Sequence, residues 1–211
     1  MMLPVTSLPR VLWQHIASWL QGDKAIIHLR ATCRWLRRVE IHKLPRHMER
    51  HLTKDRLQSV VSLRHLDIRY HEWVTNEMIK NCTHLEWLDV ERSTVTWFPS
   101  TLLHLDICGR EDVTNEMIQD AFQQVGTRLE WLGVERTTVT WFPSTLRYLD
   151  ICGCKDITNE MLQRCTRLEW LDASNTTITW FPPTLRHLYI WNRTDITNEM
   201  LAHLTNCKII R

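Results

Sequence analysis

The stretch LEWLDVERSTVTWFPST at residues 85–101 returns as LEWLGVERTTVTWFPST at 129–145 and as LEWLDASNTTITWFPPT at 168–184. Between these copies lies a second, longer unit, which begins LRHLDIRYHEWVTNEMI at 63–79 and returns at 102, 146 and 185. The two units alternate with lengths of 22 and 17 residues, and the copy at 102 carries five extra residues. Seven consecutive copies, starting at 63, 85, 102, 129, 146, 168 and 185, predict a chain of stacked repeats.

Each unit opens with Leu-x-x-Leu-x-(Ile/Val), with Ala173 replacing the last residue in one copy. Recurring with a period of about 20 to 29 residues, this pattern is the leucine-rich-repeat signature. One unit alone cannot bury its apolar positions 1, 4 and 6, so neighbouring units must stack. We therefore expect residues 63–211 to form a short right-handed leucine-rich-repeat solenoid, of the α/β or α+β class, with a curved parallel sheet.

The backs of the two units differ. In the short unit, Pro99 and its equivalents follow the apolar residues Val95 and Phe98 and oppose a helix, so we expect extended backbone or a tight turn. In the long unit, Thr75 and its equivalents suit a helix N-cap, and Glu77 suits the first turn of that helix.

A methionine recurs at one position of this expected helix. A methionine stripe can line a ligand groove, but recurrence in every repeat favours packing in the core. The insertion within 119–128 is expected to lengthen one helix by more than a turn. The copy at 146–165 resembles the cysteine-containing type of leucine-rich repeat, with Cys154 at the family's middle cysteine position. Arg110 and Arg193 occupy that position in other copies.

Two columns of side chains are expected on the side of the sheet that faces solvent and not the core, because unit positions 3, 5 and 7 point away from the core. Equivalent positions on neighbouring strands lie about 4.8 Å apart. Position 3, here named the aromatic column, reads His65, Trp87, His104, Trp131, Tyr148, Trp170 and His187. Position 5, named the aspartate column, reads Asp67, Asp89, Asp106, Gly133, Asp150, Asp172 and Tyr189. The candidate substrate-binding residues are all members of the aromatic column and the five aspartates.

The aspartate column predicts a partner, because like charges stacked side by side destabilise a sheet unless they are compensated. Compensation could come from a basic peptide or protein surface, or from Arg92 and Arg136. Exposed Trp and Tyr beside the column are typical of binding surfaces. The alternative is that both columns only record duplication of the repeat. A bound cation is disfavoured, since the ligands lack a loop geometry. Position 2 alternates in sign, as at Arg64 and Glu86, which favours weak cross-strand pairing.

The 11 Trp are mostly explained by repeat copy number. Three belong to the aromatic column, which is expected to face a binding surface. Trp97, Trp141 and Trp180 stand beside Phe-Pro and are expected to pack on the opposite side.

Residues 8–36 resemble an F-box. Leu8, Pro9, Leu12, Ile16 and Leu20 match its opening helix at the family spacing, and Cys33-Arg34 with Trp35 match its closing motif. Val11 stands where the family usually has an acidic residue. Followed by leucine-rich repeats, this segment identifies the chain as similar to the F-box/leucine-rich-repeat family. The resemblance implies a small all-α module at 1–40, followed by a basic helical linker and cap at 41–62.

The same resemblance implies a function. The F-box of this family docks the linker subunit of an SCF-type ubiquitin ligase, which also contains a cullin, and the repeats hold a protein substrate. The implied docking residues are Leu8, Pro9, Leu12, Ile16, Leu20, Ile27 and Trp35. The alternative is a leucine-rich-repeat interaction scaffold without a ligase role, in which the N-terminal helices only cap the repeats.

Other function classes are disfavoured. Cys, His and Asp recur by repeat without a singular catalytic constellation, so we expect no catalytic residues, no metal site and no cofactor. Residues 1–62 hold 11 Lys and Arg against 4 Asp and Glu, but they lack interleaved aromatics, so nucleic acid is not favoured. An odd number of Cys (7), no CxxC pair and no signal-peptide pattern favour reduced thiols and a cytoplasmic or nuclear, non-membrane protein.

The C-terminal residues 207–211 (CKIIR) look like the first strand of an eighth unit without a polar cap. Open strand edges invite pairing. We therefore expect this edge to be covered by a partner or to promote self-association.

Overall fold

We describe the protein from a computed structural model, which defines residues 63–124 and 126–211. The F-box-like module at 1–40, its docking residues and the linker at 41–62 lie outside the described residues.

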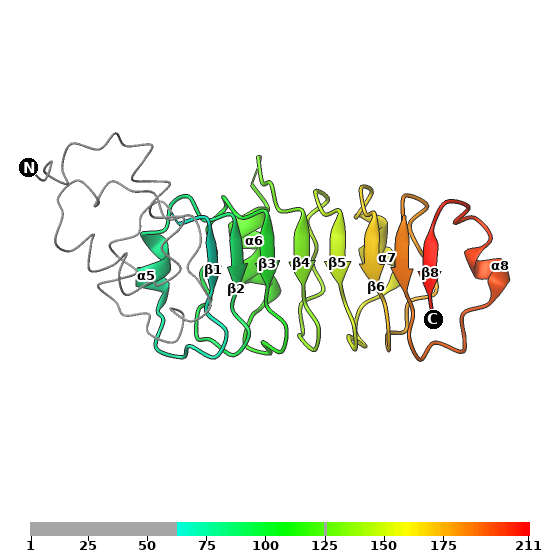
Figure 1. The fold of residues 1–211 in the computed structure, drawn as a ribbon, viewed down its shortest axis with the longest axis horizontal. Helices are drawn as coiled ribbons and strands as arrows, with labels where there is room; N and C mark the ends of the chain where they lie inside the picture. The colour runs from blue at the N-terminus through cyan, green and yellow to red at the C-terminus, as the bar shows by residue number, and fades with distance from the viewer. Residues whose placement is uncertain (1–62, 125) are drawn as a thin grey trace, which may run out of the picture.

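Eight short parallel strands form one sheet, and their order in space is their order in the chain. Figure 1 shows them side by side along the long axis of the molecule. In all seven predicted units the strand covers unit positions 3 to 5. The strands are β1 (His65–Asp67), β2 (Trp87–Asp89), β3 (His104–Asp106), β4 (Trp131–Gly133), β5 (Tyr148–Asp150), β6 (Trp170–Asp172), β7 (His187–Tyr189) and β8 (Lys208–Ile210). The predicted eighth strand is therefore present, and β8 pairs with β7.

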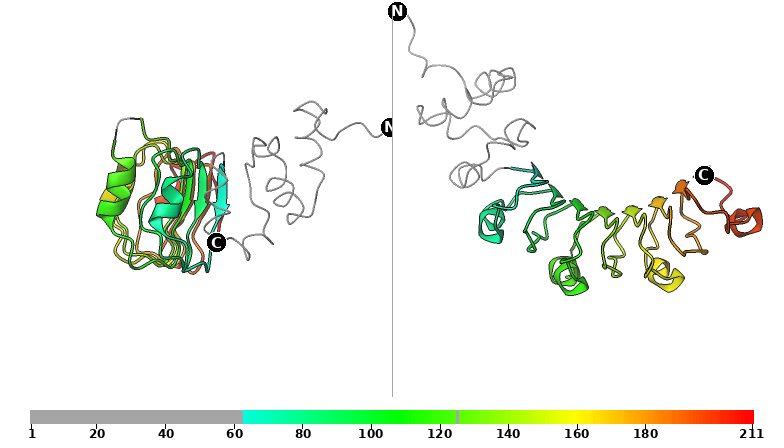
Figure 2. Two further views of the ribbon diagram at one scale, coloured as in Figure 1. Left: turned by 90° about the vertical axis from the view of Figure 1, so that its left-hand side faces the viewer. Right: turned by 90° about the horizontal axis from the view of Figure 1, so that it is seen from below.

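Helices lie on the outer side of the arc and the strands on its concave side, as the right-hand view of Figure 2 shows. Among the described residues, helices occur only in the long units, as predicted, and the backs of the short units are extended or turns. The helices are α5 (Asn76–Lys80), α6 (Asn115–Phe122), α7 (Asn159–Gln163) and α8 (Asn198–Leu201).

The core runs as a continuous strip between the sheet and the backs of the units. Unit positions 1, 4 and 6 are buried in every copy, for example Leu63, Leu66 and Ile68 at 0% exposure. Val95 and Phe98, with their equivalents in the other short units, are buried beneath them. The stacking prediction is thus confirmed, because each unit covers the apolar face of the next.

Two predictions about the helices need correction. The insertion makes α6 eight residues long, against five in α5 and α7, so it adds slightly less than one turn and not more than one. The chain instead leaves the helix and turns through Gly126, which has φ +97°.

The methionines are also less buried than predicted. Met78 is 7% exposed, but Met200 is 38% exposed, whereas the following Ile or Leu is buried in every helix. The helices are short and stand apart along the arc (Figure 2), so their flanks stay open to solvent.

An asparagine at the first position of α5, α6 and α7 ties the long unit to the short unit that follows. Asn115 Oδ1 accepts hydrogen bonds from the backbone N–H groups of Thr140 (2.8 Å) and Trp141 (2.9 Å), and its Nδ2 donates to Thr140 Oγ1 (3.0 Å). Asn76 and Asn159 make the same three contacts in their own units. These side chains satisfy extended backbone that has no sheet partner. We call them the asparagine staples.

The middle cysteine position has two solutions in this chain. Cys154 is buried, and its Sγ donates to the carbonyl of Val134 at 3.1 Å. Arg110 is also buried, and its guanidinium reaches the carbonyls of Val90 (3.1 Å) and Val95 (3.0 Å) while pairing with Asp112. The departure from the family's cysteine is therefore a replacement that satisfies the same row of backbone carbonyls from the preceding unit.

Candidate functional site: the concave face of the sheet

Four rings of the aromatic column form a continuous stack along the sheet. The ring centroids of His65 and Trp87 lie 3.7 Å apart, those of Trp87 and His104 4.9 Å, and those of His104 and Trp131 3.8 Å. The interplanar angles of 5°, 21° and 7° make every contact a stacked one. The parallel register, which sets these residues opposite one another on adjacent strands, causes the stack.

The stack is uncharged at its centre. Burial lowers the pKa of His104 to about 3, and the charge of His65 adds to the effect. His104 therefore stays neutral at physiological pH and packs between two indoles as an aromatic ring.

Gly133 makes the last contact of the stack possible. A Cβ at this position would lie 2.5 Å from Cη2 of Trp131, which is closer than carbon atoms can approach. The indole of Trp131 therefore folds over the glycine while it stacks on His104. Gly133 interrupts the aspartate column, and this close approach explains the interruption.

The aspartate column has a structural role that the sequence did not predict. In each of the five aspartates, Oδ1 accepts the backbone N–H two residues later, at 2.9 to 3.1 Å. These bonds close the turn that follows each strand. Asp67 and Asp89 are buried at 7% and 5% exposure, so these two members of position 5 are less exposed than their predicted place on the solvent-facing side of the sheet suggests. Asp106, Asp150 and Asp172 are half-buried.

The charges at the N-terminal end of the aspartate column are compensated by Arg69, not by the predicted Arg92 and Arg136. The guanidinium of Arg69 lies 2.6 Å from Asp67 and 3.1 Å from Asp89. Arg92 instead stacks over the ring of Tyr70 at 5.4 Å. The arginine at position 7 of the first unit therefore pairs with position 5 of its own strand, β1, and of the adjacent strand, β2.

The aspartates nevertheless retain an electrostatic cost of burial, which in Asp89 the ion pair with Arg69 does not offset. Burial raises the pKa of Asp89 to about 7, and repulsion from Asp106 adds to the rise. Burial also raises the pKa of Asp150 to about 6, with a further contribution from Asp172. Asp106 shifts in the same direction for the same reason. These carboxyls lie where an added positive charge would be stabilised.

Position 2 carries the predicted cross-strand ion pairs. Arg64 lies 2.6 Å from Glu86, and Arg147 lies 2.7 Å from Glu169. Both pairs are partly exposed and contribute little to stability.

The aromatic column is more open toward the C-terminal end. Tyr148 is 36% exposed and His187 is exposed. Trp170 is half-buried and contacts the ring of Tyr189, at position 5, with centroids 5.2 Å apart. The column therefore consists of a four-ring stack and a separate, more exposed group.

The second tryptophan set lies on the opposite side, beside the helices. Trp141 and Trp180 pack against the core as predicted, whereas Trp97 is 37% exposed. The backbone of Trp97 is held by Asn76 in an asparagine staple.

The side chains that could act as nucleophiles or metal ligands lie apart from one another in the described residues. The six cysteines of the described segments are free thiols, and burial raises the pKa of Cys82 and Cys152 to about 11 and of Cys165 to about 12. Cys152 follows β5, two strands away from His187 in β7. Over residues 63–124 and 126–211, no three His, Cys, Asp or Glu side chains are grouped to hold a metal ion. In the same segments no helix has the length and apolar character to cross a membrane.

Comparison with solved structures shows the same architecture. An internalin from Listeria monocytogenes is 17% identical, with a TM-score of 0.52 over 75% of this chain and 49% of that one. Internalin C2 from the same organism is 19% identical, with a TM-score of 0.53 over 75% and 73% of the two chains. The fold is a leucine-rich-repeat solenoid. A chain of the TLR13–ssRNA13 complex shares it at 17% identity and a TM-score of 0.50, over 77% of this chain and 27% of that one.

The chain thus spans about half of the first internalin, and at these identities the likeness shows the fold alone. No protein-family model and no curated protein sequence matches the chain.

Several residues that shape the concave face of the solenoid escaped the sequence analysis. Arg69 was missed because it differs from its equivalents, which are uncharged or acidic at that position. Lys208 takes the column position after His187, and the register of β7 with β8 sets the two side by side. Arg69 and Lys208 both differ from the residues at the equivalent positions of the other units, and this difference is visible in the sequence.

Proposed function

We propose that the concave face of this solenoid binds an extended segment of a protein partner. The observation that carries the proposal is the four-ring stack from His65 to Trp131. Its rings are already fixed by their neighbours, so a partner that packs on them loses little side-chain entropy on binding. Aromatic contact surface flanked by charged groups is characteristic of protein interfaces.

The charge of the face favours basic groups in the segment. Asp106 and Asp150 are half-buried without an ion-pair partner among the described residues, and their raised pKa values record the cost. Glu135 lies in the turn that follows β4, the strand between them. A cationic side chain placed over β3 to β5 removes this repulsion.

The role is binding and not catalysis. The buried thiols are protonated at neutral pH, whereas a cysteine nucleophile requires the thiolate. The five aspartates of the aspartate column accept hydrogen bonds in the turns, and His65 and His104 pack in the aromatic stack.

A pair of matched tyrosine and tryptophan variants tests the binding face. Tyr148 and Trp97 are 36% and 37% exposed but lie on opposite sides of the solenoid. For peptides selected by display against the full chain, we expect Tyr148→Ala to weaken the dissociation constant by about fivefold or more. Trp97→Ala should stay within about twofold. Equal effects of the two variants would contradict a binding site on the concave face.

A second, narrower proposal is that the chain is a substrate receptor of an SCF-type ubiquitin ligase in the cytoplasm or nucleus. It is supported by the F-box-like pattern of residues 8–36, and it assigns linker-subunit docking to that segment. Full-length protein should retain the linker subunit and a cullin in a pull-down, and a Leu8→Asp, Pro9→Ala variant should lose both. Absence of linker-subunit binding by the intact chain would leave the interaction scaffold as the function.

A further inference from the structure

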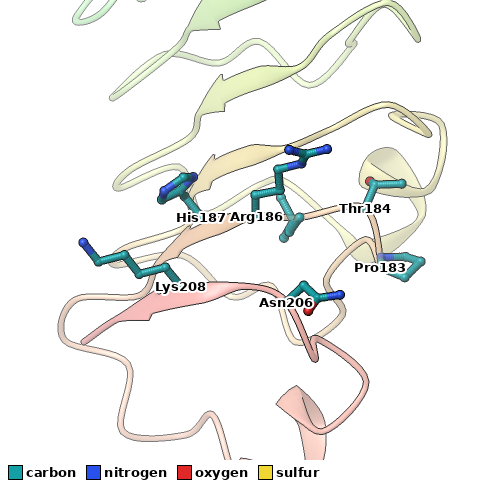
Figure 3. A pocket seen from close by; sticks show the side chains of 7 residues that line it. Pro183, Thr184, Arg186, His187, Asn206 and Lys208 are labelled. Atoms are coloured by element: carbon teal, nitrogen blue, oxygen red, sulfur yellow. The ribbon is translucent and has the colours of Figure 1, made fainter.

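An open pocket of about 570 Å³ lies at the C-terminal end of the concave face, where the chain enters β7 and β8. Figure 3 shows His187 and Lys208 side by side on the two strands, with Asn206 and Thr184 on the segments that lead into them. Pro183, Leu185 and Arg186 complete the lining. None of the residues that line the pocket is acidic.

The cations of this pocket are only weakly neutralised. Arg186 lies 3.7 Å from Glu169, but that carboxylate is engaged more closely by Arg147 at 2.7 Å. The side chain of Arg186 is 72% exposed. Lys208 is exposed and has no ion-pair partner within the described part of the chain. The pocket therefore carries a surplus of positive charge beside the side-chain amide of Asn206, whereas the hydroxyl of Thr184 already donates to the carbonyl of Leu168 at 2.6 Å.

The surroundings restrict what kind of anion fits. Only a few strands away, the same face carries the half-buried carboxyls of Asp106, Asp150 and Asp172. A polyanion such as a nucleic acid strand, laid along the sheet, would meet these carboxylates and be repelled. A single anionic group on an otherwise apolar or basic segment meets complementary charge at both places.

We propose that this pocket binds an acidic side chain of the protein segment that occupies the concave face. The inference rests on the proposed function and adds the orientation in which the segment lies on the concave face. The basic part of the segment lies over β3 to β5, and its acidic part lies in the pocket between β7 and β8. The face thereby selects partners by the spacing of opposite charges.

The spacing follows from the sheet. From Asp150 on β5 to Lys208 on β8 the path crosses three strand intervals, or about 14 Å at about 4.8 Å each. An extended peptide advances about 3.3 Å per residue, so the glutamate should stand about four residues from the arginine.

Labelled synthetic peptides test this on the full chain by fluorescence anisotropy. The probe has one arginine and one glutamate four residues apart, separated by apolar residues. The comparison peptides replace the glutamate by glutamine, move it next to the arginine, or replace it by phosphoserine. Inorganic phosphate and a single-stranded oligonucleotide complete the panel.

We expect the probe to bind about fivefold more tightly than the glutamine and the adjacent-charge peptides. Lys208→Glu should abolish this preference, and Arg186→Gln should reduce it. Lys155→Glu makes the same charge change at an exposed site away from the pocket and should leave the preference intact.

Equal binding of the probe and the glutamine peptide would overturn the pocket while leaving the concave face as a binding site. Failure of every peptide to bind would overturn the proposed function itself. Tighter binding of phosphoserine, competition by inorganic phosphate alone, or preference for the oligonucleotide would overturn the carboxylate assignment.

Discussion

The asparagine staples should contribute most of the coupling between the backs of adjacent units, and Asn115 provides the sharpest test. Replacing it by alanine removes the acceptor for the backbone N–H groups of Thr140 and Trp141 and the donor to Thr140 Oγ1. Each net hydrogen bond contributes about 1 kcal/mol, and a partly buried N–H left without a partner adds to the loss. We therefore expect Asn115→Ala to lower the free energy of unfolding by about 2–4 kcal/mol.

The chain supplies its own control. Asn198 occupies the same first position of α8, but within the described residues its Oδ1 accepts a single hydrogen bond, from Arg211 Nη2 at 3.1 Å, and that pair is exposed. Asn198→Ala should cost less than about 0.5 kcal/mol. Both variants gain the same helix propensity, which favours alanine over asparagine, so the difference between them isolates the staple.

Urea unfolding followed by circular dichroism measures both variants. Asn115→Asp keeps the acceptor oxygen and should retain most of the stability that Asn115→Ala loses. If Asn115→Ala and Asn198→Ala are equally destabilised, the reasoning is refuted, because the three contacts of Asn115 would then contribute nothing beyond the helix terminus.

Three further substitutions probe the concave face and its turns. Because the pKa of Asp150 is raised to about 6, stability present below the unfolded pKa is lost as the pH rises through 6. Asp150→Asn keeps the turn acceptor and should raise stability by about 1–2 kcal/mol at pH 8, with little change at pH 4, in urea titrations at both values. Gly133→Ala should expel the indole of Trp131, costing about 1–3 kcal/mol and shifting its fluorescence; an unchanged spectrum would contradict the close approach. Gly109→Ala, at φ +70° with nothing near its Cβ, should lower stability by about 1 kcal/mol from backbone strain alone.

The sequence predicts the buried half of this fold well because burial in a solenoid is periodic. Leucines at position 4 lie opposite the equivalent leucines of the preceding and following units, so the pattern determines the sheet and its register. The threonine N-caps follow from local chemistry in the same way. Periodicity predicts the side of the sheet on which a residue lies but not its exposure: Asp89 is only 5% exposed, with Arg69 3.1 Å from its carboxylate.

Residues with positive φ show a similar limit to what residue types alone can predict. Position 8 has positive φ in all seven units, at Tyr70, Arg92, Gly109, Arg136, Gly153, Asn175 and Asn192. Two of these are glycines and two are asparagines, which tolerate this conformation, but Tyr70 and both arginines do not suggest it. The stack of units imposes the turn, and only comparison across the repeats reveals it.

The aspartates and the aromatic column also show where specificity resides. A residue present in nearly every unit, such as Asp89, is accounted for by a contact that every unit needs, so its recurrence says little about a partner. The residues that break the pattern have no such explanation. Gly133 opens the column for an indole, Tyr189 replaces an aspartate with a ring, and Lys208 ends the aromatic column with a cation. Tyr189 and Lys208 lie at the C-terminal end of the sheet, whereas Gly133 lies beneath the indole of Trp131, so a partner that reads direction must contact Tyr189 and Lys208.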